Sequence, residues 1–370
     1  MEGENFAMAL PDLLTALDGA AVAAPAQWPT RRKELLAILE REQYGIRPPW
    51  SGKAGGQVTD VISPCCAGRA RHEKLAVAFD TPAGPFSFPM DFLFPADGQA
   101  HPLLLLLNFR PGVYDRYCPA EEIIDNGFAL AYICYTDITS DDADMTSGLA
   151  GCFPRHDPAT DWGKLSMWAF AASRALDVLL PRPEVDARNA AVIGHSRLGK
   201  TALLCGAYDE RVRFALANNA GCGGDALEQT KHPGAETYAD MAKTFPYWFC
   251  GNRSKYADHQ AAMPYDQHFL LAAIAPRCVA VGSATQDLWA DPYSQQLCCA
   301  AASPAWRLHG LDGYIGPETP VRVNAAYGEG RIGYHLREGV HYLSRQDWLR
   351  YMAFVKQHLA EGSGKDVTIP

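Results

Sequence analysis

Three residues of this sequence have the types and the chain order that nucleophilic catalysis needs. Ser196 lies in the segment Gly194–Lys200 (GHSRLGK), Asp287 follows one apolar run, and His341 follows another. A serine hydroxyl is a poor nucleophile unless a base takes its proton, and that base must be oriented by an acid. The three side chains therefore predict acyl transfer through an activated serine.

The segment around Ser196 is predicted to form a strand, a sharp turn and a helix. An apolar β-branched run precedes the turn, and helix-compatible residues continue to Leu204. Such a turn exposes the hydroxyl beside the backbone N–H groups of a helix N-terminus, where negative charge is stabilised. The spacing departs from G-x-S-x-G, because Leu198 stands two residues after the serine and Gly199 three. The alternative is a serine that only caps a helix.

The acid and the base are expected in loops that follow strands. Asp287 comes after the apolar run 278–284, and His341 comes after the short run 332–336. Ser196, Asp287 and His341 would then all lie at the carboxyl ends of strands, where open α/β sheets place their sites.

Other residues compete for both roles. His335 and His309 are alternatives for the base, although His335 falls within a strand pattern. Asp291 is an alternative for the acid, and so is an acid at the end of the preceding strand. At that earlier position the chain has Asn219, which carries no charge to stabilise an imidazolium.

Two cations follow the serine. Arg197 and Lys200 stand in the first turn of the predicted helix, where positive charge is unfavourable. The alternative interpretation is that both side chains simply extend into solvent at the start of the helix. Their placement favours a function, either holding an oxyanion or binding hydroxyls and a carboxyl group of a substrate. The N–H of Arg197 is the first expected oxyanion donor and its guanidinium the second.

The order of predicted elements indicates an α/β protein with a mostly parallel, doubly wound sheet covered on both faces. From residue 103 onward, strands and helices alternate. Alternating apolar residues over 57–95 predict an antiparallel start of the sheet. We expect a single domain over residues 1–370, with a helical and antiparallel extension over 1–100 and an aromatic-rich insertion over 225–268. The predicted strands cover 103–107, 128–135, 191–193, 212–217, 278–284 and 332–336, and the predicted helices cover 31–41, 120–126, 165–179, 294–302 and 348–359.

Composition limits the possible functions. A net charge of −9 over 370 residues argues against nucleic acid as a partner. No apolar run approaches the roughly 20 residues that span a bilayer, so no membrane association is expected. The start, Met1-Glu2-Gly3-Glu4, is acidic and shows no export signal, which leaves an intracellular protein or one whose signal was removed. The compartment and the oligomeric state stay open.

The cysteines are interpreted as mostly buried free thiols. There are eleven, an odd number, scattered through predicted core elements. The chain has no C-x-x-C pair and no H-E-x-x-H, so we expect neither a metal site nor a cofactor.

Five motifs in the same order resemble the glucuronoyl esterases. They are residues 194–200 (GHSRLGK), 220–224 (AGCGG), 266–268 (DQH), 274–277 (IAPR) and 287–292 (DLWADP), and the resemblance covers roughly residues 28–360. It implies an α/β-hydrolase, a three-layer αβα sandwich that needs no metal. It also implies hydrolysis of the ester between a glucuronic acid branch of xylan and a lignin alcohol.

The resemblance also implies roles for particular residues. Ser196 would be the nucleophile, His341 the base and Arg197 an oxyanion stabiliser, while Lys200 would bind sugar hydroxyls. Glu236 matches a position that contacts the uronate. The alternative interpretation of Glu236 is a charged side chain on the surface. Trp289 matches a tryptophan that lines the uronate. The alternative interpretation of Trp289 is a side chain that only packs against its neighbours.

The chain departs from the fungal members at two places. They carry the acid where this chain has Asn219, whereas bacterial relatives often place it after the later strand, as Asp287 would be. They also flank the serine and histidine with bridged cysteines, where this chain has His195 and Tyr342. The resemblance is thus to a bacterial-type member.

Three functions are compared. The first is a serine esterase that hydrolyses esters of (4-O-methyl-)D-glucuronic acid through an acyl-enzyme. The second is a carbohydrate esterase of the same fold with another specificity, such as an acetyl xylan esterase. The third is a carbohydrate-binding protein of the same descent that has lost catalysis. The intact serine, histidine and candidate acid argue against this third function.

Overall fold

The computed structural model describes residues 10–113, 115–317 and 319–359. The expectation concerning Met1-Glu2-Gly3-Glu4 lies outside the described residues.

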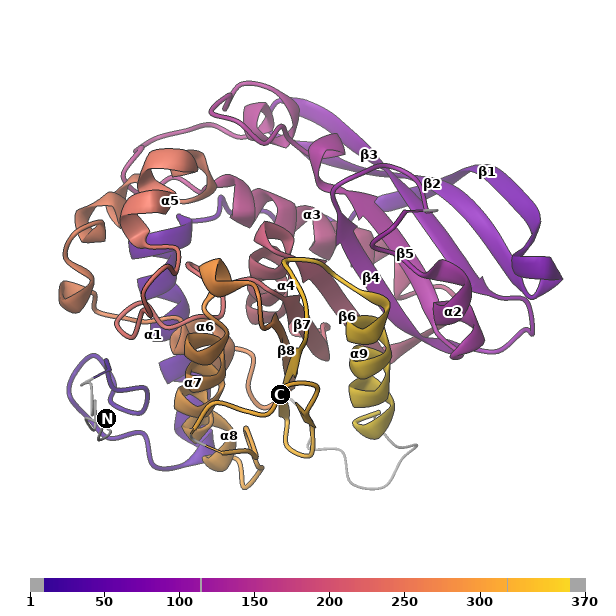
Figure 1. Ribbon diagram of the computed structural model, residues 1–370. Helices are drawn as coiled ribbons and strands as arrows, with labels where there is room; N and C mark the ends of the chain where they lie inside the picture. The colour runs from indigo at the N-terminus through magenta and orange to yellow at the C-terminus, as the bar shows by residue number, and fades with distance from the viewer. Residues whose placement is uncertain (1–9, 114, 318, 360–370) are drawn as a thin grey trace.

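The strands of the described chain form one ten-stranded sheet, in the order β1-β2-β3-β5-β4-β6-β7-β8-β10-β9. Along the stretch β5-β4-β6-β7-β8-β10, each strand is parallel to its neighbours. Strand β2 pairs antiparallel with both β1 and β3, and β3 pairs antiparallel with β5. The antiparallel strands extend from the body of the molecule as a wing (Figure 1). The bounds are β1 (Gly55–Cys65), β2 (Ala70–Thr81), β3 (Gly84–Pro95), β4 (His101–Asn108), β5 (Ala129–Cys134), β6 (Val185–His195), β7 (Phe214–Asn218), β8 (Cys278–Ala284), β9 (Ala326–Tyr327) and β10 (Ile332–Arg337).

Helices cover both faces of the sheet, which confirms the predicted three-layer α/β class. Helices α2 and α9 pack on one face, and α3, α4, α6 and α7 pack on the other, with α1 outside α6 (Figure 1). The bounds are α1 (Trp28–Leu39), α2 (Ala120–Asp125), α3 (Lys164–Leu179), α4 (Arg197–Tyr208), α5 (Tyr238–Thr244), α6 (His268–Ala272), α7 (Pro292–Ala302), α8 (Pro304–Arg307) and α9 (Arg345–Gln357).

Strand β4 shows why the central strands are apolar throughout. Leu103, Leu105 and Leu107 belong to the core under α3 and α4. Leu104 and Leu106 belong to the core under α2 and α9. Successive side chains of a strand point to opposite faces, so a strand covered on both sides buries every residue. Each buried leucine contributes about 1.5–3 kcal/mol relative to an exposed one.

The predicted element types are confirmed, but several helix bounds differ. Helix α1 begins at Trp28 rather than residue 31, and α7 begins at Pro292 rather than residue 294. Each has proline in its first turn, where a missing N–H costs nothing. Helix α9 begins at Arg345 rather than residue 348, because Ser344 and Asp347 form a capping box.

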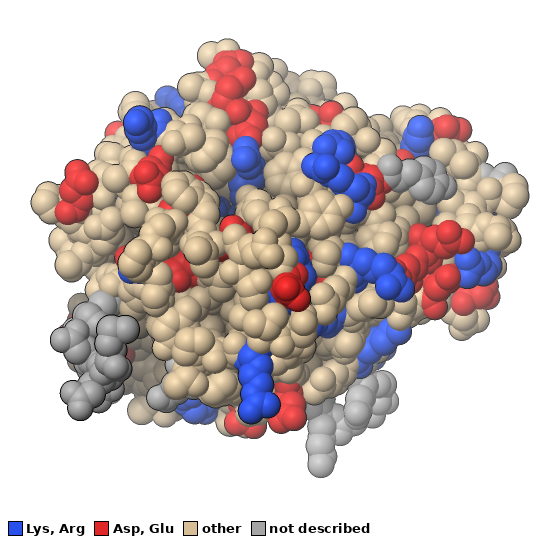
Figure 2. All heavy atoms as spheres, viewed as in Figure 1, with Lys and Arg blue, Asp and Glu red and all other residues tan. Residues whose placement is uncertain are grey.

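All eleven cysteines are free thiols, as expected. None of the helices in the described ranges is long and apolar enough to cross a membrane. No group of three or more His, Cys, Asp or Glu side chains in those ranges is arranged to hold a metal ion. On the face shown in Figure 2, basic and acidic side chains are interspersed.

Candidate active site

Ser196 occupies a strained turn between β6 and α4. Its backbone has φ 57° and ψ −127°, a conformation that is costly for a residue other than glycine. A Cβ on Gly194 would lie 2.1 Å from the carbonyl oxygen of Leu198, so only glycine allows the helix to begin this close to the strand. The Ser196 side chain makes no capping hydrogen bond. The hydroxyl is therefore not engaged in the capping role that was the alternative interpretation.

Asp287 and His341 meet at the carboxyl ends of β8 and β10. Nδ1 of His341 lies 2.6 Å from Oδ2 of Asp287. The same oxygen accepts a 2.6 Å hydrogen bond from Nδ2 of Asn219. Burial alone would raise the pKa of Asp287, but the hydrogen bonds from His341 and Asn219 hold it below its usual value. The carboxylate is thus ionised near neutral pH and placed to orient the imidazole.

The imidazole of His341 lies beside the turn that carries the serine. Its ring centroid is 4.3 Å from that of His195, the residue before Ser196. His195 is itself held by a 2.7 Å contact between its Nδ1 and Oδ1 of Asn218. Burial lowers the pKa of His195 to about 3, so this ring stays neutral next to His341. Three distant segments therefore bring Ser196, Asp287 and His341 to one edge of the sheet.

The competing residues have other partners. His335 is buried and pairs with Asp347 at 2.9 Å, while His309 packs edge-on against Trp28. Asp291 accepts a 3.2 Å hydrogen bond from the Ser294 amide at the start of α7 and a 2.7 Å contact from His232. These side chains are therefore engaged with residues other than His341.

Arg197 is anchored by a residue that the sequence did not single out. Its Nη1 is hydrogen-bonded to the carboxylate of Asp141, in the loop after β5. The guanidinium lies over Trp248, with 4.5 Å to the ring centroid, and Phe245 is stacked on Trp248 at 3.9 Å. The polar loop after β5 and the aromatic insertion therefore meet at this arginine.

Lys200, Glu236 and Trp289 are linked to one another and differ in their exposure. Lys200 is only 3% exposed, and its ammonium donates to the carbonyl of Ala220. Burial lowers the pKa of Lys200, while the charge of Glu236 acts in the opposite direction. The Glu236 amide donates to the Trp289 carbonyl at 2.9 Å, and the Trp289 side chain is 50% exposed. Trp289 is thus open to a ligand, whereas Lys200 lies beneath the surface.

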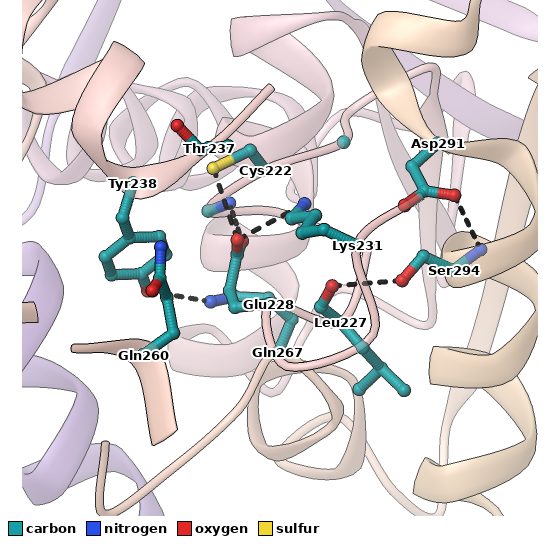
Figure 3. A network of polar contacts seen from close by, with 12 residues as sticks. Cys222, Leu227, Glu228, Lys231, Thr237, Tyr238, Gln260, Gln267, Asp291 and Ser294 are labelled. Carbon is teal, nitrogen blue, oxygen red and sulfur yellow. Dashed lines mark hydrogen bonds and ion pairs between the residues drawn. The ribbon is translucent and has the colours of Figure 1, made fainter. Parts of the chain in front are cut away.

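A buried polar network holds the loop between β7 and α5, which carries Glu236 (Figure 3). The Glu228 carboxylate accepts hydrogen bonds from the Gly223 amide at 2.6 Å and the Cys222 thiol at 3.3 Å, and it pairs with Lys231 at 3.2 Å. Oγ of Ser294 donates to the Leu227 carbonyl at 2.9 Å, which ties this loop to α7. These contacts fix the backbone from which Glu236 projects.

The loop that carries His341 is braced by a buried ion pair. Nε of Arg337 lies 2.7 Å from Oδ2 of Asp347, and its Nη2 donates to the carbonyls of Val340, at 3.0 Å, and Tyr342. Asp347 also caps α9 through Ser344. The S-x-x-D spacing of residues 344–347 was the available signal for this support.

Replacing Asp347 by asparagine should lower the free energy of unfolding by about 3 kcal/mol at pH 7, because it leaves Arg337 buried without a counter-charge. Burial alone would raise the pKa of Asp347, but the hydrogen bond from His335 and nearby positive charges lower it to about 2. A lowered folded-state pKa contributes stability above the unfolded value of about 3.9, and that stability is lost as the pH falls toward about 2. Urea unfolding at pH 7 and pH 3 should show the difference between the two proteins shrinking at the lower pH. The exposed Asp258→Asn change is the control, and equal stability of Asp347→Asn and the parent at pH 7 would contradict this account.

Comparisons with known proteins point to one family. The family model described as "Glucuronyl esterase, fungi" matches residues 87–310. The chain is 32% identical to carbohydrate esterase MZ0003 from an unknown prokaryotic organism, an alignment that covers 96% of this chain and 90% of the relative. It is 25% identical to a 4-O-methyl-glucuronoyl methylesterase of Phanerochaete carnosa, over 82% of this chain and 72% of that protein.

A solved structure shares the whole architecture. The glucuronoyl esterase from Solibacter usitatus superposes with a TM-score of 0.87 and 32% sequence identity, covering 96% of this chain and 99% of that chain. The similarity therefore extends over nearly the whole length of both chains.

Proposed function

Because the chain belongs to the glucuronoyl esterase family, we propose that it hydrolyses esters of D-glucuronic acid and 4-O-methyl-D-glucuronic acid, such as those that join glucuronoxylan to lignin. It is a carboxylic ester hydrolase with the α/β-hydrolase fold. The observation that carries the proposal is the paired Asp287 and His341 beside the strained turn of Ser196.

Ser196 acts as the nucleophile in this mechanism. Nε2 of His341 takes the hydroxyl proton while Oγ attacks the carbonyl carbon of the uronyl ester. Asp287 holds Nδ1–H of His341, keeps the ring in the tautomer that can accept the proton, and stabilises the imidazolium that forms. The paired orientation is in place before substrate arrives, which supports general-base catalysis.

The tetrahedral intermediate places negative charge on the former carbonyl oxygen. The amide of Arg197 is the first of α4, so it has no acceptor within the helix and can donate to this oxygen. The Arg197 guanidinium is the second donor.

The reaction then proceeds through an acyl-enzyme. As the tetrahedral intermediate collapses, the bond to the alcohol breaks and His341 gives its proton to the leaving oxygen. Water then attacks the glucuronoyl–Ser196 ester with His341 again as the base, and collapse returns glucuronate and the free serine.

Recognition of the sugar is assigned to the residues at the rim and floor of the site. Trp289 is exposed enough to stack against the pyranose ring, and Glu236, which is 8% exposed, is assigned the hydrogen bonds from the sugar hydroxyls. Lys200 supports the floor, where burial lowers its pKa and the charge of Glu236 acts in the opposite direction. These contacts would favour a uronyl ester over a small acetyl ester.

The specificity is tested by comparing kcat/KM for benzyl glucuronate, 4-nitrophenyl acetate and acetylated xylan. We expect the value for benzyl glucuronate to exceed the other two by at least about 100-fold, because only that substrate uses the sugar contacts in the transition state. A higher rate of acetate release from acetylated xylan would instead identify an acetyl xylan esterase of the same fold.

A further inference from the structure

Asp141, in the loop after β5, accepts four hydrogen bonds from other segments of the chain. Its Oδ1 accepts from Nε1 of Trp248 at 2.7 Å, and its Oδ2 accepts from the Tyr135 hydroxyl at 3.0 Å and from Arg197. Its backbone carbonyl accepts from the Tyr247 hydroxyl at 3.0 Å. Three segments of the chain therefore fix the position of this one carboxylate.

The same carboxylate fixes the guanidinium of Arg197. An arginine side chain has many rotamers, and holding it in one costs up to about 2 kcal/mol of conformational entropy. Here the Asp141 contact restrains one end, and Trp248 and Phe245 lie against the guanidinium at 4.5 Å and 5.2 Å from their ring centroids. Nε of Arg197 is buried and has no hydrogen-bond partner among the described residues. The side chain is thus already immobilised before a substrate binds.

The ion pair between Asp141 and Arg197 also affects the charge that the reaction product meets. The proposed substrate is a neutral ester at the reacting carbon, whereas the product carries a carboxylate there. An unpaired guanidinium would bind that carboxylate through strong paired hydrogen bonds and retain it. With its charge balanced by Asp141, Arg197 can still donate to a developing oxyanion but attracts the finished carboxylate less.

On the basis of the proposed function, we propose that Asp141 is the positioning residue for Arg197. It holds the guanidinium where the oxyanion forms, and it offsets the positive charge that would otherwise slow release of the glucuronate product. Asp141 acts through Arg197 and does not itself touch the reacting atoms.

The test compares Asp141→Asn with Asp142→Asn, a matched change at the next residue. Asp142 is exposed and contacts Lys164 and Ser140 rather than Arg197. Asp141→Asn should lower kcat for benzyl glucuronate by about 10- to 100-fold with little change in KM, since misplaced groups cost about that much. It should also lower the inhibition constant of glucuronate by a factor of about five, because the charge of Arg197 is no longer balanced. Asp142→Asn should leave kcat, KM and the inhibition constant unchanged.

A double-mutant cycle separates positioning from a general structural effect. In an Arg197→Gln background, adding Asp141→Asn should cause no further loss of kcat, because the group it positions is gone. Full additivity of the two losses, or unchanged kcat and glucuronate inhibition in folded Asp141→Asn, would overturn the inference. Unchanged kcat in Arg197→Gln alone would instead contradict the oxyanion role in the proposed function.

A milder variant keeps the test informative if Asp141→Asn does not fold. Tyr135→Phe removes one hydrogen bond to Asp141 and retains the ring. It should lower kcat several-fold in the parent and not at all in the Arg197→Gln background. An equal loss in both backgrounds would overturn the inference.

Discussion

Replacing Ser196 by alanine should lower kcat for benzyl glucuronate by about 10⁴- to 10⁶-fold, the range seen when the serine of such a triad is removed. The variant lacks the Oγ that attacks the ester, so no acyl-enzyme can form. The stability should change little, because the Ser196 side chain makes no capping hydrogen bond. The measurement is benzyl alcohol release, with thermal unfolding of the same preparation.

The control for this change is Ser87→Ala, at an exposed position of β3. It removes the same hydroxyl and should retain full activity. Turnover of benzyl glucuronate by Ser196→Ala within tenfold of the parent would contradict the role of Ser196.

Replacing Asp287 by asparagine should lower kcat by about 10⁴-fold, with a small change in KM. Asparagine nearly preserves the shape of the side chain, but it cannot stabilise the imidazolium. Its amide can also face Nδ1 of His341 and leave the ring in the wrong tautomer. In the other orientation, the amide oxygen takes the place of Oδ2, which lies 2.6 Å from both Nδ1 of His341 and Nδ2 of Asn219, and keeps both contacts without the charge. Steady-state kinetics on benzyl glucuronate measure the loss.

Asp291→Asn is the matched comparison, since Asp291 was the other candidate in the same loop. Its carboxylate caps α7 and contacts His232, so the change should lower the melting temperature while kcat falls by less than about tenfold. A larger loss of kcat for Asp291→Asn than for Asp287→Asn would contradict the assignment of the acid.

Much of the fold could be predicted because its strands are buried on both faces. The run of leucines in β4 has no polar face, and only a covered parallel strand accommodates that composition. The ends of helices were less predictable. The start of α9 depends on Ser344 and Asp347, and Asp347 also serves to hold Arg337 and His335. The contacts with Arg337 and His335 are tertiary contacts, and the local sequence pattern around residue 347 does not predict them.

The candidate site also has a part that the sequence predicts and a part that it does not. The positions of Ser196, Asp287 and His341 at strand ends follow from element order alone, so they could be predicted. The partner of Arg197 could not, because Asp141 lies in a different loop 56 residues away in the sequence. In the sequence, Asn219 is only an uncharged residue where an acid could stand, whereas the structure gives it a contact with Asp287, 68 residues away. Contacts between loops depend on which strand ends lie side by side, and no single segment of sequence specifies that.

The most direct measurement is covalent labelling of the folded protein with a fluorophosphonate, followed by peptide mass spectrometry. Such a probe reacts with a serine hydroxyl activated by a neighbouring base. The account predicts one adduct per chain, on the peptide that contains Ser196, with no adduct in Ser196→Ala and much slower labelling in Asp287→Asn. Absence of labelling in an active preparation, or an adduct on another serine, would contradict it.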